Sequence, residues 1–122
     1  MPLSILIADD ARLTRNILKY LLNAHVKESN IIEAISGQQA LDIIRSQPID
    51  ILFLDLHMPE IDGFELLKII QKENYHPKIA VCSADFQDET IQRVKQFGAI
   101  TFINKTLIRD QFEIALKSLG VI

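Results

Sequence analysis

The 122-residue chain has one cysteine, four glycines, four prolines and no long apolar run. The single cysteine, Cys82, excludes an internal disulfide, and no secretory leader is apparent, so we expect a reducing, cytoplasmic setting. Glycine and proline are scattered and mark no linker or low-complexity tract. The longest apolar runs, residues 5–8, 51–54 and 79–82, are far shorter than the ~20 residues of a membrane span. We therefore expect no membrane segment.

The chain also lacks a large excess of positive or negative charge. Thirteen basic and sixteen acidic residues leave a net charge of −3. This balance argues against a domain that mainly neutralises nucleic-acid phosphate, so we expect no direct nucleic-acid partner. A hydrophobic content of 48% and a charged content of 24% are typical of a globular protein and exclude wholesale disorder. The length suits one domain, residues 1–122, because two halves would each lack a sufficient core.

Short apolar runs alternate with longer stretches of helical periodicity. The runs cover residues 3–8, 31–35, 51–54, 78–82 and 100–103, and their richness in isoleucine is typical of strands buried on both faces of a parallel sheet. Ser36 is placed to cap the second helix, and Gly98 to end the fourth. For the first helix, the spacing predicts one buried face formed by Leu13, Ile17, Tyr20, Leu21 and Ala24. Five such pairs predict an α/β fold, a (βα)5 doubly wound five-stranded parallel sheet.

Polar residues follow four of the predicted strands. Asp9 and Asp10 come after the first strand, Asp55 after the third, Ser83 after the fourth and Lys105 after the fifth. These strand ends share one edge of the sheet, where doubly wound folds bind ligands. Clustered carboxylates repel one another unless a cation lies among them, and Mg²⁺ prefers such oxygen ligands. The set suits phosphoryl transfer to an aspartate, with the cation and the lysine stabilising the transferred group.

Each of these residues, taken alone, has a simpler interpretation. An Asp-Asp pair or a single acid after a strand is often a helix cap, and a lone serine is usually a turn residue. His25 and His76 are expected at the surface, and Cys82 inside a strand. The hypothesis of a functional site depends on all five polar residues occurring together, each at the end of its strand.

Four separated motifs resemble the CheY-like receiver domain of bacterial two-component response regulators. The most specific is residues 55–63, DLHMPEIDG, which matches the family pattern D-x-x-M-P-x-x-D-G. Residues 5–10 (ILIADD), 82–84 (CSA) and 104–105 (NK) match the other three motifs. The resemblance covers essentially the whole chain and implies a flavodoxin-like sheet with strand order 2-1-3-4-5.

By this resemblance, Asp55 accepts a phosphoryl group from a sensor histidine kinase or phosphotransfer protein. Asp9, Asp10, Asp55 and the backbone carbonyl of His57 would hold Mg²⁺, which leaves the His57 side chain facing solvent. Lys105 would pair with phosphoryl oxygens, while Ser83 and Phe102 would act as switch residues. The domain would catalyse its own phosphorylation and dephosphorylation without turning over an external metabolite. Phosphorylation would change the surface between residues 87 and 119.

One residue departs from the family pattern. Proline joined by a cis bond usually follows the family's lysine, but here the residue is Thr106. A cis bond before a residue other than proline costs about 2.5–4 kcal/mol, so we predict a trans Lys105–Thr106 bond. That bond could displace Lys105 and weaken phosphoryl coordination.

Other functions remain open at this point. The main alternative is an atypical receiver that acts as a phosphorylation-independent binding module, which Thr106 favours. Haloacid dehalogenase-like phosphatases carry a D-x-D nucleophile after the first strand, which Asp9-Asp10-Ala11 does not match. The chain also lacks the G-x-G-x-x-G motif that would indicate a dinucleotide carrier.

The chain runs from just before the first strand to just after the fifth helix, so we expect a stand-alone receiver, or one excised from a longer protein whose effector domain is absent here. The partner would be a downstream target protein or that effector domain, and the oligomeric state monomer or weak homodimer.

Overall fold

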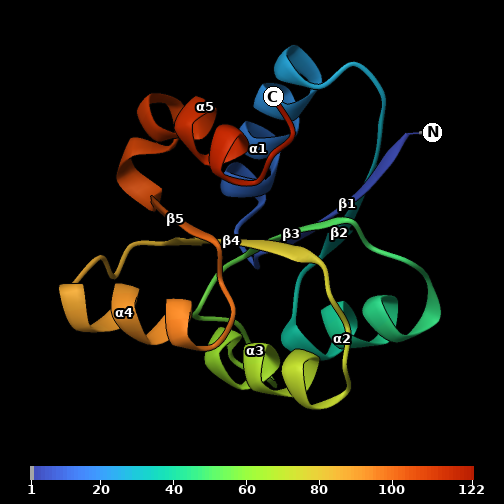
Figure 1. Ribbon diagram of the computed structural model, residues 1–122, viewed down its shortest axis with the longest axis vertical. Helices are drawn as coiled ribbons and strands as arrows, with labels where there is room; N and C mark the ends of the chain where they lie inside the picture. Colours follow the sequence, from blue (N-terminus) through green and yellow to red (C-terminus); the bar gives the residue numbers. More distant parts are fainter. Residues whose placement is uncertain (1) are drawn as a thin grey trace.

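Five parallel strands alternate with five α-helices along residues 2–122, the part of the chain that the computed structural model describes (Figure 1). The elements are β1 (Leu3–Ala8), α1 (Arg12–His25), β2 (Ser29–Ala34), α2 (Gly37–Ser46), β3 (Ile51–Leu54), α3 (Gly63–Lys72), β4 (Lys78–Ser83), α4 (Asp88–Gln96), β5 (Thr101–Asn104), the 3₁₀ turn η1 (Lys105–Leu107) and α5 (Ile108–Ser118). All neighbouring strands pair in parallel, in the order β2-β1-β3-β4-β5. The predicted fold class and strand order are confirmed. Met1 lies outside the described residues.

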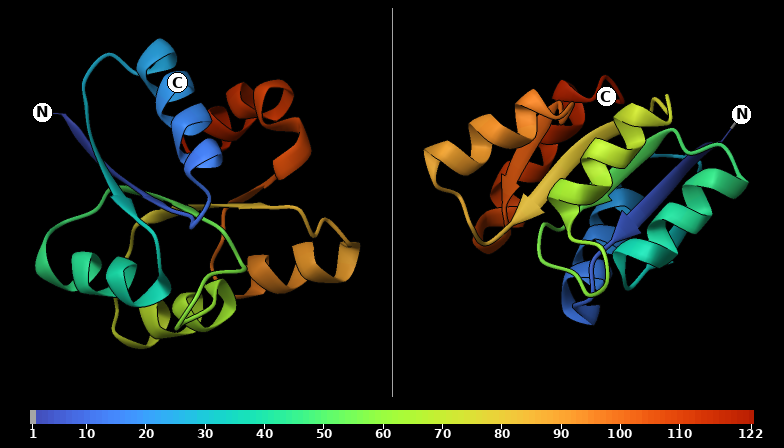
Figure 2. Two further views of the ribbon diagram at one scale, coloured as in Figure 1. Left: turned by 180° about the vertical axis from the view of Figure 1, so that it is seen from behind. Right: turned by 90° about the horizontal axis from the view of Figure 1, so that it is seen from below.

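The sheet separates two helical layers, as Figures 1 and 2 show. Helices α1 and α5 cover one face, and α2, α3 and α4 cover the other. Successive strand residues point to opposite faces, so Ile5 and Ile7 pack under α1 and α5, while Leu6 and Ala8 pack under the other three helices. The central strands therefore supply two cores. Of the helices in residues 2–122, none is sufficiently long and apolar to cross a lipid bilayer.

The buried face of α1 differs in part from the predicted one: Leu21 is buried as predicted, but Ala24 is exposed. The structure buries Thr14, Leu18, Leu21 and Leu22, whereas Leu13 and Tyr20 are 72% and 62% exposed. The reason is that apolar residues cover slightly more than half of the circumference of this helix, so the helical period fits more than one choice of buried face. Packing against both the sheet and α5 selects the face that contains Leu18 and Leu22.

Two predicted helix boundaries are confirmed. The Ser36 hydroxyl accepts a hydrogen bond of 3.1 Å from the Gln39 amide at the start of α2. Gly98 follows the end of α4 with a φ of +100°, and its amide donates to the Lys95 carbonyl at 3.1 Å. Glycine adopts this backbone conformation without the penalty of a side chain.

Burial on both faces is confirmed for β1, β3 and β4 but not for the edge strands. Most residues of β2 and β5 are only partly buried, because each edge strand has one neighbour. Ile35 and Ile100, predicted to lie in strands, lie just outside them and are exposed. The apolar runs therefore predicted that the edge strands exist, but not the residues at which these strands begin and end.

The helices differ in how firmly they are anchored. Helix α4 buries two of its nine residues, Thr90 and Val94. Helix α5 buries Ile108, Phe112, Ala115 and Leu116 among its eleven. Because buried apolar area supplies most of the free energy of packing, α4 is held to the sheet less strongly than α5.

Candidate functional site

Three carboxylates meet at the carboxyl edge of the sheet. Asp9 and Asp10 follow β1, and Asp55 follows β3, the strand that pairs beside it. Parallel pairing brings these strand ends together, and one oxygen from each carboxylate lies within 4.8 Å of the others. Asp9 and Asp55 are buried, whereas Asp10 is exposed. The predicted acidic cluster is therefore formed.

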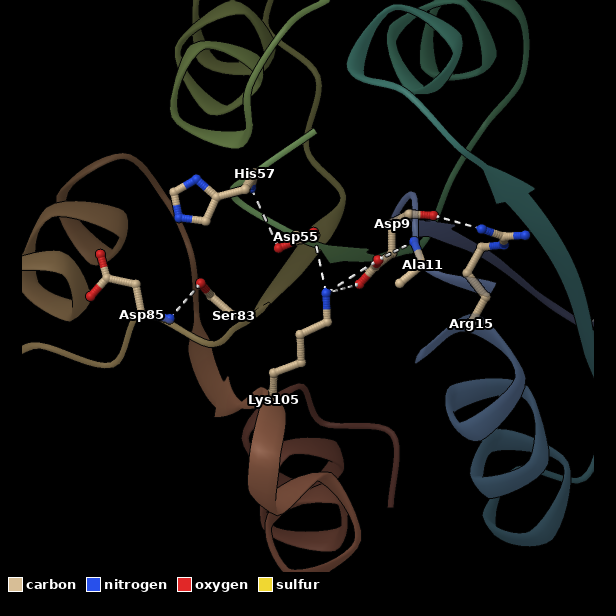
Figure 3. Close-up of polar contacts among 8 residues, drawn as sticks. All are labelled: Asp9, Ala11, Arg15, Asp55, His57, Ser83, Asp85 and Lys105. Atoms are coloured by element: carbon tan, nitrogen blue, oxygen red, sulfur yellow. Dashed lines mark hydrogen bonds and ion pairs between the residues drawn. The ribbon is translucent and has the colours of Figure 1, made fainter. Parts of the chain in front are cut away.

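Lys105 reaches into this cluster from the end of β5 (Figure 3). Its Nζ lies 3.0 Å from Asp9 Oδ2 and 3.3 Å from Asp55 Oδ2. The ammonium thus bridges the two buried carboxylates and offsets part of their mutual repulsion. The same geometry suits an ammonium that stabilises a negatively charged group bound at Asp55.

Burial controls the electrostatics of the site. It raises the pKa of Asp9, because removal from water penalises the charged form, and the nearby Asp55 raises it further. Burial alone would lower the pKa of Lys105, but the hydrogen bond to Asp9 and the charge of Asp55 outweigh it and raise that pKa. Asp9 Oδ2 contacts Lys105 as an ion pair but has no hydrogen-bonded partner among the described residues.

The surroundings of Asp9 Oδ2, which contacts Lys105 without a hydrogen bond, indicate whether the carboxylates fit a cation. Asp9 Oδ2 is buried and retains the capacity to accept a ligand, and every side-chain donor in the cluster is a carboxylate oxygen. Mg²⁺ prefers such ligands and keeps water in its remaining positions, and the exposure of Asp10 leaves the cluster open to solvent. The residues present fit Mg²⁺.

Ser83 is connected to the start of α4. Its hydroxyl oxygen accepts a hydrogen bond of 3.1 Å from the Asp85 amide (Figure 3). The Asp85 carboxylate in turn accepts a hydrogen bond of 3.0 Å from the Thr90 hydroxyl, within α4. The Ser83 hydroxyl is thus linked through Asp85 to Thr90 of α4, the helix with the fewest buried residues.

His57 and Phe102 differ in their exposure to solvent. The His57 side chain is exposed, as predicted, and Figure 3 shows it directed away from Lys105. It lines a surface hollow together with Ala84 and Phe86. Phe102, on β5, is partly buried and packs against the core under α2, α3 and α4. The Phe102 ring therefore lies between the core and solvent, a position from which rotation about its side-chain bonds can bury it further or expose it.

Thr106 does not displace Lys105. None of the peptide bonds in the described part of the chain is cis, so the predicted trans Lys105–Thr106 bond is confirmed. Asn104 Oδ1 accepts hydrogen bonds from the Thr106 amide at 3.0 Å and from its hydroxyl at 2.8 Å. With this turn in place, Lys105 Nζ contacts Asp9 and Asp55, so the trans bond does not take Lys105 out of the site.

The simpler interpretations of three other residues are confirmed. Cys82 is buried within β4, and burial raises the pKa of its thiol to about 12, so it is not a nucleophile at neutral pH. His25 and His76 are exposed. None of the three belongs to the acidic cluster.

The sequence did not indicate two contributions to the site. Arg15 donates a hydrogen bond of 2.9 Å to the Asp9 carbonyl and another of 2.9 Å to Glu33. Thr90 anchors Asp85 from within α4. An arginine or a threonine in a helix does not by itself indicate such a role. The contact between Arg15 and Glu33 can be predicted only once β1 and β2 are known to pair.

Comparisons with known proteins agree with this geometry. The family model for the response regulator receiver domain matches residues 5–117. The chain is 31% identical to sporulation initiation phosphotransferase F of Bacillus subtilis, over 93% of this chain and 90% of that protein. It is 35% identical to the chemotaxis protein CheY of Bacillus subtilis, over 88% of each chain.

Other relatives are longer. The chain is 39% identical to response regulator GtcR of Aneurinibacillus migulanus, but it spans only 42% of that protein.

Among solved structures, it resembles that of the CheX-CheY-BeF3-Mg complex from Borrelia burgdorferi, with a TM-score of 0.89 and 29% identity over all of this chain and 92% of that one. The chain belongs to the response regulator receiver domain family, the phosphorylation-dependent switches of two-component signalling.

Proposed function

We propose that the chain, as one receiver domain over residues 1–122, accepts a phosphoryl group on Asp55 from a phosphohistidine donor. The observation that carries this proposal is the convergence of three carboxylates and Lys105 at one sheet edge, with a buried Asp9 oxygen that lacks a hydrogen bond. Phosphorylation then changes the surface formed by α4, β5 and α5, which controls the binding of a partner.

The side chains divide the reaction between them. An Asp55 carboxylate oxygen forms the new bond to phosphorus, the bond from phosphorus to the donor's imidazole nitrogen breaks, and that nitrogen keeps the electron pair. Lys105 Nζ, 3.3 Å from Asp55 Oδ2, stabilises negative charge on the phosphoryl oxygens. Asp9, Asp10, Asp55 and the His57 carbonyl would hold Mg²⁺, which supplies positive charge for the transferred group.

The output follows from the link between Ser83 and α4. A phosphoryl group on Asp55 adds about −1.5 to −2 charge and new hydrogen-bond acceptors. When the Ser83 hydroxyl turns to donate to the phosphoryl group, its present contact with the Asp85 amide changes, and the Asp85–Thr90 bond transmits this change to α4. Phe102 then rotates into the space that Ser83 leaves. A Phe102→Ala variant that is phosphorylated normally and still signals normally would contradict this step.

Receiver domains interact with histidine kinases or phosphotransfer proteins and with downstream partners. For this chain we propose a phosphohistidine donor of that kind, and either a separate target protein or an attached effector domain. The chain matches most of the two short relatives but less than half of GtcR, so both arrangements have precedent among its relatives. A monomer or weak homodimer without direct nucleic-acid contact, in the cytoplasm, stays our prediction.

The proposal is tested by measuring the intact mass after incubation with acetyl phosphate and Mg²⁺, beside an Asp55→Asn control. We expect a phosphoryl adduct that needs Mg²⁺ and is absent from the control. A beryllofluoride titration, followed by NMR, detects acceptor geometry even where the phosphoryl lifetime is short. Failure of both experiments would overturn the proposal and favour a phosphorylation-independent binding module.

A further inference from the structure

The Arg15 side chain joins three parts of the fold. From the first turns of α1, its Nη1 donates a hydrogen bond of 2.9 Å to the Asp9 carbonyl at the end of β1. Its Nε donates at 2.9 Å to Glu33 on β2. The side chain is only 12% exposed. A guanidinium is a rigid, planar fork, so these two bonds together fix its position.

Arg15 acts on the loop between β1 and α1, where the N-cap of the helix contributes no side-chain hydrogen bond. The N-cap residue of α1 is Ala11, whose side chain cannot accept a capping hydrogen bond. Within the loop, the Ala11 amide donates a hydrogen bond of 2.8 Å to Asp9 Oδ1. The Asp9 amide donates at 3.0 Å to the Ala34 carbonyl, and Ala11 and Lys105 contact its carboxylate. Arg15 supplies the side-chain contact to its carbonyl, as Figure 3 shows.

Glu33 holds the guanidinium in turn. Its backbone pairs with Ile7, two residues before Asp9, so its carboxylate lies beside the end of β1. Glu33 Oε2 also accepts a hydrogen bond of 3.1 Å from Lys19. Burial would raise the pKa of Glu33, but Lys19 and Arg15 together lower it, so the carboxylate is ionised at neutral pH.

We propose that Arg15, oriented by Glu33, is a positioning residue for the cation site: it holds the backbone of Asp9 so that Asp9 and Asp10 face Asp55. This inference rests on the proposed function, because it assumes that the acidic cluster binds Mg²⁺. Arg15 touches neither the cation nor the phosphoryl group. It acts through the carbonyl of a residue whose carboxylate does.

If Arg15 acted only through its charge, replacing it would change the Mg²⁺ affinity in the opposite direction from the change expected if it positions Asp9. Arg15 and Lys19 are both cations near the acidic cluster, so by Coulomb's law removing either one should strengthen Mg²⁺ binding. If Arg15 positions Asp9, its removal weakens Mg²⁺ binding instead. Lys19 shares Glu33 but makes no contact with Asp9 among the described residues, which makes Lys19→Met a matched control for Arg15→Met.

The experiment is a calorimetric titration of Mg²⁺ into the wild type, Arg15→Met and Lys19→Met. Loss of residues that orient metal ligands typically weakens affinity by about 10–100-fold. We expect the dissociation constant to rise about tenfold in Arg15→Met and not to rise in Lys19→Met. Arg15→Lys keeps the charge but not the fork, and we expect it to be weakened as well. Hydrogen exchange of the Ala11 amide should accelerate in Arg15→Met and not in Lys19→Met.

The outcomes separate this inference from the function on which it rests. If the wild type itself bound no Mg²⁺, the proposed function would fail, and this inference with it. If the wild type bound Mg²⁺ and folded Arg15→Met bound it equally or more tightly, the positioning role alone would be overturned. Equal weakening in Lys19→Met would also overturn it. Should Arg15→Met not fold, hydrogen exchange of the Ala11 amide in Glu33→Gln decides the matter, because the lost negative charge would weaken Mg²⁺ binding by itself. Faster exchange supports the role, and unchanged exchange refutes it.

Discussion

Replacing Asp9 by asparagine should stabilise the metal-free domain while abolishing its response to Mg²⁺. The Asp9 carboxylate is buried, and burial is the main reason that its pKa is raised. Asparagine has nearly the same shape, and its amide oxygen can still accept the hydrogen bond from Ala11. The variant therefore removes a buried charge without leaving a cavity.

The size of the effect follows from the distances. Carboxylate oxygens of Asp9 and Asp55 lie within 4.8 Å, and two such charges repel by roughly 3–4 kcal/mol at an effective dielectric constant near 20. Lys105 Nζ, 3.0 Å from Asp9, offsets this with roughly 5 kcal/mol of attraction. The attraction exceeds the repulsion by only about 1–2 kcal/mol, which is less than the desolvation of the buried charge, several kcal/mol per ion, so desolvation decides the sign. We expect a net stabilisation of about 1–3 kcal/mol.

Urea unfolding at pH 7, with EDTA and with Mg²⁺, measures both effects. Mg²⁺ at about 100 times its dissociation constant should stabilise the wild type by about 2.7 kcal/mol and leave Asp9→Asn unchanged. The pKa of Asp9 is higher in the folded state than its usual 3.8. The wild type is therefore stabilised by protonation below pH 3.8 and loses this stabilisation as the pH rises through the higher folded value. The advantage of the variant should shrink as the pH falls.

Asp42→Asn is the matched control. Asp42 is exposed on α2 and accepts a hydrogen bond from Gln38 alone among the described residues, so the change should stay within about 0.5 kcal/mol. The reasoning fails if Asp9→Asn is less stable than the wild type in EDTA, or if its advantage persists unchanged at acidic pH. The first result would mean that Lys105 outweighs the burial of Asp9, and the second that the advantage does not come from removing a buried charge.

Three further perturbations test other parts of the structure. Thr106→Pro removes both hydrogen bonds to Asn104 Oδ1 and should lower the free energy of unfolding by about 1–2 kcal/mol in urea, whereas unchanged stability would show that the turn needs neither bond. Thr90→Val leaves Asp85 without its partner in α4; amide exchange at the start of α4 should accelerate, and unaltered exchange would contradict the link from Ser83. Because burial raises the pKa of the Cys82 thiol to about 12, a thiol reagent at pH 8 should modify it only in urea, and rapid modification of the native domain would refute its burial.

The fold was largely predictable because its determinants are local. Apolar runs of four to six residues separated by helical stretches predict a parallel sheet, and the polar residues after those runs predict which edge carries the site. The face of α1 was not predictable in this way. Its burial depends on α5, which lies more than 80 residues along the chain, and sequence periodicity contains no information about that contact.

The acidic cluster was predictable for the same reason, because each member directly follows a strand. The supporting residues were not. Arg15 and Glu33 are 18 residues apart and meet only through the pairing of β1 with β2. Thr106 is the opposite case, in which the sequence suggested a change that the structure does not show. Its departure from the family pattern suggested a displaced Lys105, but Thr106 forms a local turn with Asn104, and Lys105 still contacts Asp9.

The light anchoring of α4 affects any protein that reads this domain. On the proposed function, phosphorylation shifts α4, and a helix held by two buried residues needs little free energy to shift, so we expect some molecules to adopt the shifted arrangement even without phosphate. A target protein that selects the shifted α4 must then favour phosphorylation of Asp55 by the same factor by which phosphorylation favours its own binding. Basal signalling and sensitivity to the target are thus set together, by how much of one short helix is buried.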